Sequence, residues 1–82
     1  MEIKIDSKQN KYIEIDNLRI TYVKRINRST IKDWPEADVI RIQAYRGNES
    51  KSLHQGAEYP VYDEKSAFNL LGSMAKLFAN ID

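Results

Sequence analysis

The chain has 82 residues, of which 41% are hydrophobic and 30% are charged, and its formal net charge is +1. This length and balance are typical of one small globular domain and exclude a disordered or membrane-spanning chain. The absence of cysteine excludes disulfides, thiolate catalysis and cysteine metal sites, and the near-neutral charge gives no overall attraction to nucleic acid or anionic lipid.

Three strands are predicted in the first part of the chain. Residues 2–6, 11–15 and 18–25 each alternate apolar with polar side chains, which is the period of a strand with one buried face. Asp16 and Asn17 separate the second run from the third and tolerate the left-handed backbone of a tight hairpin turn. Since residues 2–6 lack the continuous apolar core of a secretory signal, we expect a cytoplasmic protein.

The middle of the chain predicts an irregular connection followed by two more strands. Residues 26–38 lose the alternation and contain Pro35, which cannot sit in a regular central strand. The alternation returns over residues 39–46, and residues 53–62 can pair back as a last strand. Pro60 lacks an amide proton, so this last strand is expected at an edge of the sheet.

An amphipathic helix is predicted over residues 64–79, with Asp63 as its N-cap. Its apolar residues cover an arc of roughly 200°, against the roughly 100° that a helix needs to lie on a sheet. The positions expected in the core are Ala67, Leu71, Met74 and Phe78. The sequence therefore predicts a single α+β domain spanning residues 1–82, a small antiparallel sheet of about five strands packed against one C-terminal helix.

Catalytic candidates are few. His54 is the only histidine, and Ser52 and Glu58 are its nearest partners for a triad. No nucleophile-elbow pattern surrounds them, so a polar surface histidine is the favoured interpretation and a small hydrolase centred on His54 is a remote alternative. We predict no catalytic residues and a protein that is not an enzyme.

Metal and cofactor motifs are also weak. Asp33, Glu36 and Asp38 lie close together in the sequence, but without the spacing of a calcium loop. The glycines are isolated and form no phosphate-binding loop. We therefore predict no metal site and no cofactor.

Cations and aromatic residues gather in the middle of the chain. Alternation places Arg19, Arg25 and Arg41 on the sheet face opposite the helix, where a basic face with aromatics is typical of single-stranded nucleic-acid binding. Glu14 and Glu58 can neutralise that face, which favours an ordinary solvated surface instead. The candidates for nucleic-acid or partner binding are Arg19, Arg25, Arg28, Trp34, Arg41, Gln43, Tyr45 and Arg46.

One flank of the helix has small residues that allow another backbone to come close. Gly72 inside a helix costs about 1 kcal/mol relative to alanine, which a close contact can offset. The self-association candidates are Phe68, Gly72, Ala75 and Ala79. We therefore expect a homodimer.

The leading functional hypothesis is a small non-catalytic accessory module that binds a protein partner whose identity the sequence does not give. The alternative is nucleic-acid binding through the basic sheet face, and no membrane partner is expected. The abundance of Ile, Lys and Asn is typical of low-GC bacteria, phages and mobile elements.

Overall fold

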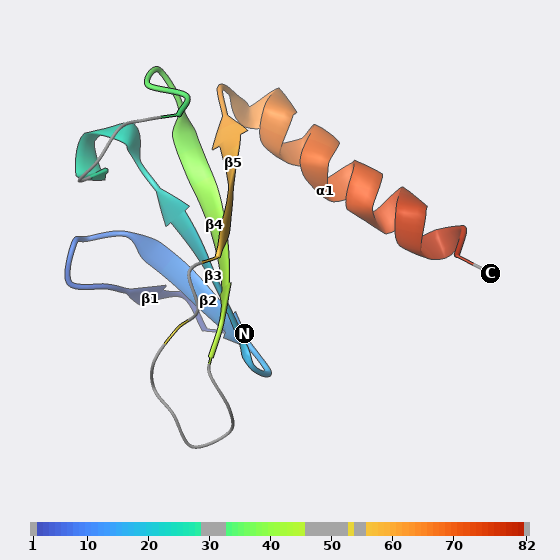
Figure 1. Ribbon diagram of the computed structural model, residues 1–82, viewed down its shortest axis with the longest axis horizontal. Helices are drawn as coiled ribbons and strands as arrows, with labels where there is room; N and C mark the ends of the chain where they lie inside the picture. Colours follow the sequence, from blue (N-terminus) through green and yellow to red (C-terminus); the bar gives the residue numbers. More distant parts are fainter. Residues whose placement is uncertain (1, 29–32, 46–52, 54–55, 82) are drawn as a thin grey trace.

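The computed structural model describes residues 2–28, 33–45, 53 and 56–81 (Figure 1). Five strands form one antiparallel sheet in the order β1-β2-β3-β4-β5, so each strand pairs with its neighbours in the sequence. The elements are β1 (Lys4–Ile5), β2 (Lys11–Ile15), β3 (Leu18–Val23), the 3-10 helix η1 (Arg25–Asn27), β4 (Asp38–Ala44), β5 (Ala57–Val61) and α1 (Glu64–Ala79). The predicted α+β class, an antiparallel sheet with one C-terminal helix, is confirmed.

Two of the first three strands are shorter than their alternation predicts. β1 ends at Ile5 because the Asp6 carboxylate accepts the backbone amides of Lys8 at 2.9 Å and Asn10 at 2.8 Å, which turns the chain. β3 ends at Val23 because the backbone enters η1, where the Arg25 amide donates to the carboxylate of Asp38 at 2.7 Å. The tight turn between β2 and β3 has the expected left-handed residue, Asp16, at φ 52°.

The last strand pair also differs from its predicted bounds. β4 begins at Asp38, one residue early, and its last residue is Ala44. β5 covers residues 57–61 of the predicted 53–62, Leu53 makes an isolated bridge to Tyr45, and residues 54–55 lie outside the described residues. The predicted end of the fourth strand at Arg46 falls outside the described residues.

The strand register divides the sheet into two faces. Ile13, Ile20, Ile42 and Ala57 lie side by side across β2 to β5, and the next row is Tyr12, Thr21, Arg41 and Glu58. One side of the sheet, called the apolar face, carries Ile5, Ile13, Ile15, Leu18, Ile20, Tyr22, Ile40, Ile42, Ala44, Ala57, Tyr59 and Val61, together with Lys11 and Asp38 near one end. The opposite side, the polar face, carries Lys4, Tyr12, Glu14, Arg19, Thr21, Val23, Val39, Arg41, Gln43 and Glu58.

The buried core is small and lies at one end of the sheet. Val23 and Val39 are register partners at the end of the β3–β4 pair, and both are fully buried together with nearby Ala37. These valines alternate with the residues of the apolar face, so they belong to the polar face. The irregular connection between β3 and β4 therefore begins and ends beside the core.

The helix begins where Asp63 caps it. The Asp63 carboxylate accepts the Ser66 amide at 2.8 Å, and the Ser66 hydroxyl accepts the Asp63 amide at 3.1 Å, which completes a capping box. α1 has the bounds that the sequence predicts, and it leaves the sheet beside β5 and extends away from it (Figure 1).

The core positions expected on the helix are wrong. Leu71, Met74 and Phe78 are all exposed, and only the first turns of α1 contact β5. The reason is the direction in which the capped joint sends the helix, which carries its later turns beyond the sheet. In the part of the chain that the structure describes, no helix is long and apolar enough to cross a membrane.

Candidate functional site

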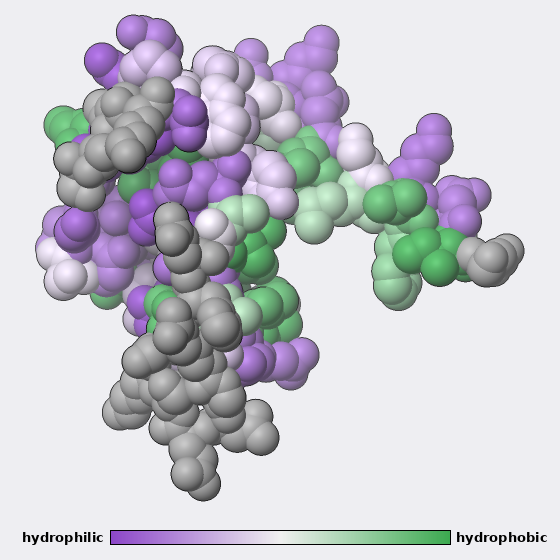
Figure 2. Space-filling view, viewed as in Figure 1, coloured by the Kyte–Doolittle hydropathy of each residue, from purple (hydrophilic) through white to green (hydrophobic). Residues whose placement is uncertain are grey.

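An apolar groove runs between the apolar face of the sheet and α1. It has a volume of about 270 Å³ and is lined by apolar side chains from β2, β3, β4 and the helix. Its main lining residues are Ile3, Ile13, Ile20, Tyr22, Ile40 and Leu71. Figure 2 shows hydrophobic side chains on both sides of the hollow between the sheet and the helix. The groove is open to solvent, so these side chains are available to a partner.

Leu71, the residue of α1 that lines this groove, is 55% exposed, whereas Tyr22 on the sheet is 37% exposed. Elsewhere on the helix, Phe78 is 80% exposed, Leu77 70% and Phe68 62%. Contiguous apolar surface of this kind is uncommon on soluble monomers and marks interaction sites. Among the residues that the structure describes, much of the apolar surface of α1 is therefore left without a packing partner.

The predicted self-association residues all lie on this exposed helix. Phe68, Ala75 and Ala79 are exposed, and a Cβ atom added at Gly72 would meet no atom within 4 Å. This flank is thus open to the approach of another backbone. Whether a second chain occupies it stays a prediction.

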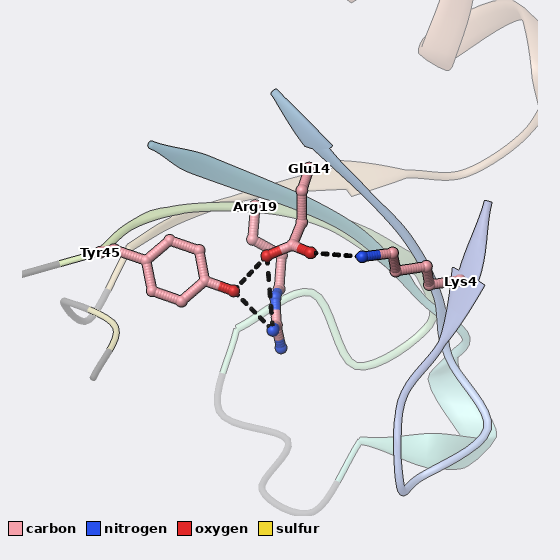
Figure 3. A network of polar contacts seen from close by, with 4 residues as sticks. All are labelled: Lys4, Glu14, Arg19 and Tyr45. Carbon is pink, nitrogen blue, oxygen red and sulfur yellow. Dashed lines mark hydrogen bonds and ion pairs between the residues drawn. The ribbon is translucent and has the colours of Figure 1, made fainter. Parts of the chain in front are cut away.

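The polar face holds a network centred on Glu14 (Figure 3). Lys4 donates to Glu14 at 3.0 Å, the Tyr45 hydroxyl also donates to Glu14, and Arg19 donates to that hydroxyl at 2.7 Å. The Arg19 guanidinium lies 4.2 Å from the centre of the Tyr12 ring. The hydrogen bond from Tyr45, followed by that from Lys4, holds the pKa of Glu14 below its usual value, and the same bond raises the pKa of Tyr45.

A second polar site lies on the same face beside β5. Arg41 donates to Glu58 at 2.7 Å, and this pair borders a cavity of about 440 Å³ lined also by Asp33, Trp34, Gln43 and Gly56. Arg19 and Gln43 are register partners, so the sheet brings Arg19, Arg41, Gln43 and Tyr45 together as the alternation predicts. Each of the two arginines is ion-paired with a carboxylate of the same face.

Arg25 and Arg28 do not extend this face. Arg25 belongs to η1, and its Nε donates to the carbonyl of Pro35 at 2.7 Å. Arg28 donates to the carbonyls of Asp33 and Trp34, each at 2.9 Å. The expected position of Arg25 on the sheet face is wrong because β3 ends two residues before it. Arg46 lies outside the described residues.

Tyr22 and Asp38 form a contact that the sequence analysis does not anticipate. The Tyr22 hydroxyl donates to the Asp38 carboxylate at 2.6 Å at the rim of the groove. Burial, together with this hydrogen bond, raises the pKa of Tyr22 to about 12. The same bond, with the amide of Arg25, lowers the pKa of Asp38. Tyr22 lies in a predicted strand and Asp38 at the end of the predicted irregular connection, so their contact follows only from the β3–β4 register.

The structure describes only part of the catalytic alternative centred on His54. His54 and Ser52 lie outside the described residues, whereas Glu58 is paired with Arg41. Over residues 2–28, 33–45, 53 and 56–81, no group of three or more His, Asp or Glu side chains is placed to hold a metal ion.

Comparisons of this chain with protein-family models, with curated proteins and with solved structures give no match. The groove and the polar face are therefore the features that bear on function.

Proposed function

We propose that this chain is a non-catalytic protein-binding module that binds through the apolar groove and the apolar side of α1. The observation that carries the proposal is the exposure of Leu71, Met74 and Phe78 on one side of a helix that borders the apolar groove of the sheet. Removing such side chains from water stabilises an association by about 25 cal/mol per Å². A partner that covers the groove gains this energy.

The groove favours a protein ligand over a small molecule. Small-molecule sites are usually enclosed and contain a few polar groups that orient the ligand. This groove is open, and among the described residues that line it Lys11 and Tyr22 are the polar side chains on the apolar face, while Tyr12 and Thr21 belong to the opposite face. An apolar helix or strand of a protein fits such a surface better, because it needs area and shape more than polar anchors.

The polar face gives less support to nucleic-acid binding. Arg19 and Arg41 are each paired with a carboxylate, and Arg25 and Arg28 bind backbone carbonyls of the β3–β4 connection. Guanidinium groups in these contacts must leave them to neutralise phosphates, which weakens the electrostatic term on which nucleic-acid binding depends. We therefore keep protein binding as the proposal, and we also propose a homodimer and a cytoplasmic location.

A photo-activated amino acid placed in the groove tests the proposal. We would introduce p-benzoylphenylalanine at Leu71, which lines the groove, and at Asn69 as the control on the polar side of the same helix. Irradiation in extract of the source cells, or of the purified chain, is expected to give protein adducts from position 71 and not from position 69. Absence of adducts at position 71, or equal adducts at both positions, would contradict the proposal.

A further inference from the structure

We infer that the occupant of the apolar groove is α1 of a second copy of this chain, so that two chains exchange their helices reciprocally. This inference rests on the proposed function, because it takes the groove as the binding surface and names the partner. It assigns the partner's helix the position on the sheet that a chain's own α1 leaves uncovered.

One chain carries both halves of the proposed interface. The sheet provides an apolar face and the helix an apolar side, and the described residues leave both partly uncovered. A two-fold interface requires a surface that is complementary to itself, with each half on both partners. The apolar face and α1 meet this requirement, since each copy offers a sheet and a helix to the other.

The direction of the helix also favours the exchange. The amides of Tyr62 and Asp63 both donate to the Ser66 hydroxyl at 3.1 Å, which fixes the angle between β5 and α1. Only the first two turns remain near β5, where Ala67 and Leu70 are half-buried. Figure 1 shows the later turns diverging from the sheet. The apolar end of α1 therefore points away from its own sheet and is free to lie on another.

The dimensions of the helix and of the sheet also fit an exchange. A helix of 16 residues is about 24 Å long, and five strands spaced by about 4.8 Å give a sheet about 19 Å wide. The exposed parts of the large apolar side chains on α1 and the apolar face amount to on the order of 1,000 Å² per chain, and stable interfaces bury about 800 Å² per partner. Reciprocal exchange thus has the length and the area of a stable dimer.

The helix side of the exchange brings no charge to the groove. At 100° per residue, the arc of α1 that runs from Leu77 through Met74 and Phe78 to Leu71 contains no charged residue. Lys65 and Lys76 lie outside this arc. The charged side chain among the described residues that line the groove, Lys11, is itself exposed, so it can keep its ammonium group in solvent while the apolar surfaces meet.

Single-cysteine variants test the exchange directly, because the chain has no cysteine of its own. Chains carrying Ile20→Cys in the groove and differently tagged chains carrying Met74→Cys on α1 would be mixed and treated with a short bismaleimide. A link between the two tags joins two chains by construction, so it reports a helix of one chain on the sheet of the other. The control replaces Met74→Cys by Asn69→Cys, and we expect its yield of mixed-tag product to be at least about tenfold lower.

Light scattering on the unaltered chain gives an independent readout. We expect twice the 9.6 kDa mass of one chain at micromolar concentration. A single-chain mass at several hundred micromolar, or a dimer that gives only links between two Met74→Cys chains, would overturn helix exchange. A monomer that still forms photo-adducts with other proteins from position 71 would overturn the exchange alone, whereas a chain without adducts would overturn the proposed function as well.

Discussion

Replacement of Phe78 by glutamine is expected to dissociate the dimer without unfolding the chain. Phe78 is 80% exposed on a single chain, so on the order of 150 Å² of its surface remains to be buried by a partner. At about 25 cal/mol per Å² this burial is worth at most about 4 kcal/mol. The ordering of the side chain and imperfect packing reduce this value, and about 2 kcal/mol is usual for an anchor residue of an interface.

A two-fold dimer contains Phe78 twice, so the substitution removes about 4 kcal/mol in total and raises the dissociation constant about a thousandfold. Sedimentation equilibrium over a dilution series measures this change. Lys76→Gln is the matched control, because Lys76 lies on the polar side of α1 and the substitution introduces the same residue, glutamine. Its dissociation constant is expected to stay within about threefold of the original.

The same substitution should leave the free energy of unfolding of the monomer within about 0.5 kcal/mol of its original value, since an exposed side chain contributes little to the chain's own packing. Urea unfolding of both chains, at a concentration where both are monomeric, checks this expectation. A loss of more than about 1 kcal/mol would place Phe78 in the core of its own chain and refute the reasoning. An unchanged dissociation constant would refute it equally.

Three further outcomes are expected. Gly56→Ala should destabilise the fold by about 2 kcal/mol or more in urea unfolding, because its Cβ would lie 1.8 Å from the backbone oxygen of Ile42, whereas Gly72→Ala, with nothing within 4 Å, should not destabilise the chain. The pKa of Asp38 is lowered by the hydrogen bond from Tyr22, so its stabilisation is complete above the unfolded-state pKa of about 4 and is lost as the pH falls through the lower folded-state value. Asp38→Asn should therefore lose less stability than the original chain between about pH 5 and pH 3, and an equal loss would contradict this assignment. Finally, single-stranded DNA on a column should not retain the protein at about 50 mM salt, since the described arginines are engaged within the chain; salt-dependent retention would revive the nucleic-acid alternative.

The local pattern of the sequence predicts both ends of α1. The bounds of α1 follow from Asp63, whose cap involves Ser66 three residues later, and from the period of the apolar residues. The end of β3 does not follow in this way, because the alternation continues to Arg25. It is set by Asp38, which lies 13 residues away and accepts the Arg25 amide. The contact between Asp38 and the Arg25 amide can be predicted only once the β3–β4 register is known.

Local patterns also predict only part of the candidate site. Alternation alone places Arg19, Arg41 and Tyr45 on one face, but the pairing of Arg19 with Glu14 and of Arg41 with Glu58 depends on which strands are neighbours. The arc of α1 predicts surplus apolar surface on the helix. It does not predict that Phe78, at the centre of the arc, is among the exposed residues, because the direction of the helix is a property of the joint at Asp63.

The two faces of the sheet therefore differ in what they still lack. On the polar face, cations, carboxylates and hydroxyls bind one another, so a ligand arriving there must compete with contacts already made. On the apolar face and α1, several large hydrophobic side chains, including Ile5, Leu71 and Phe78, remain exposed to water, and covering them brings a net gain. Because burial of apolar area is the larger and less replaceable term, the groove is the stronger candidate for the site at which this chain acts.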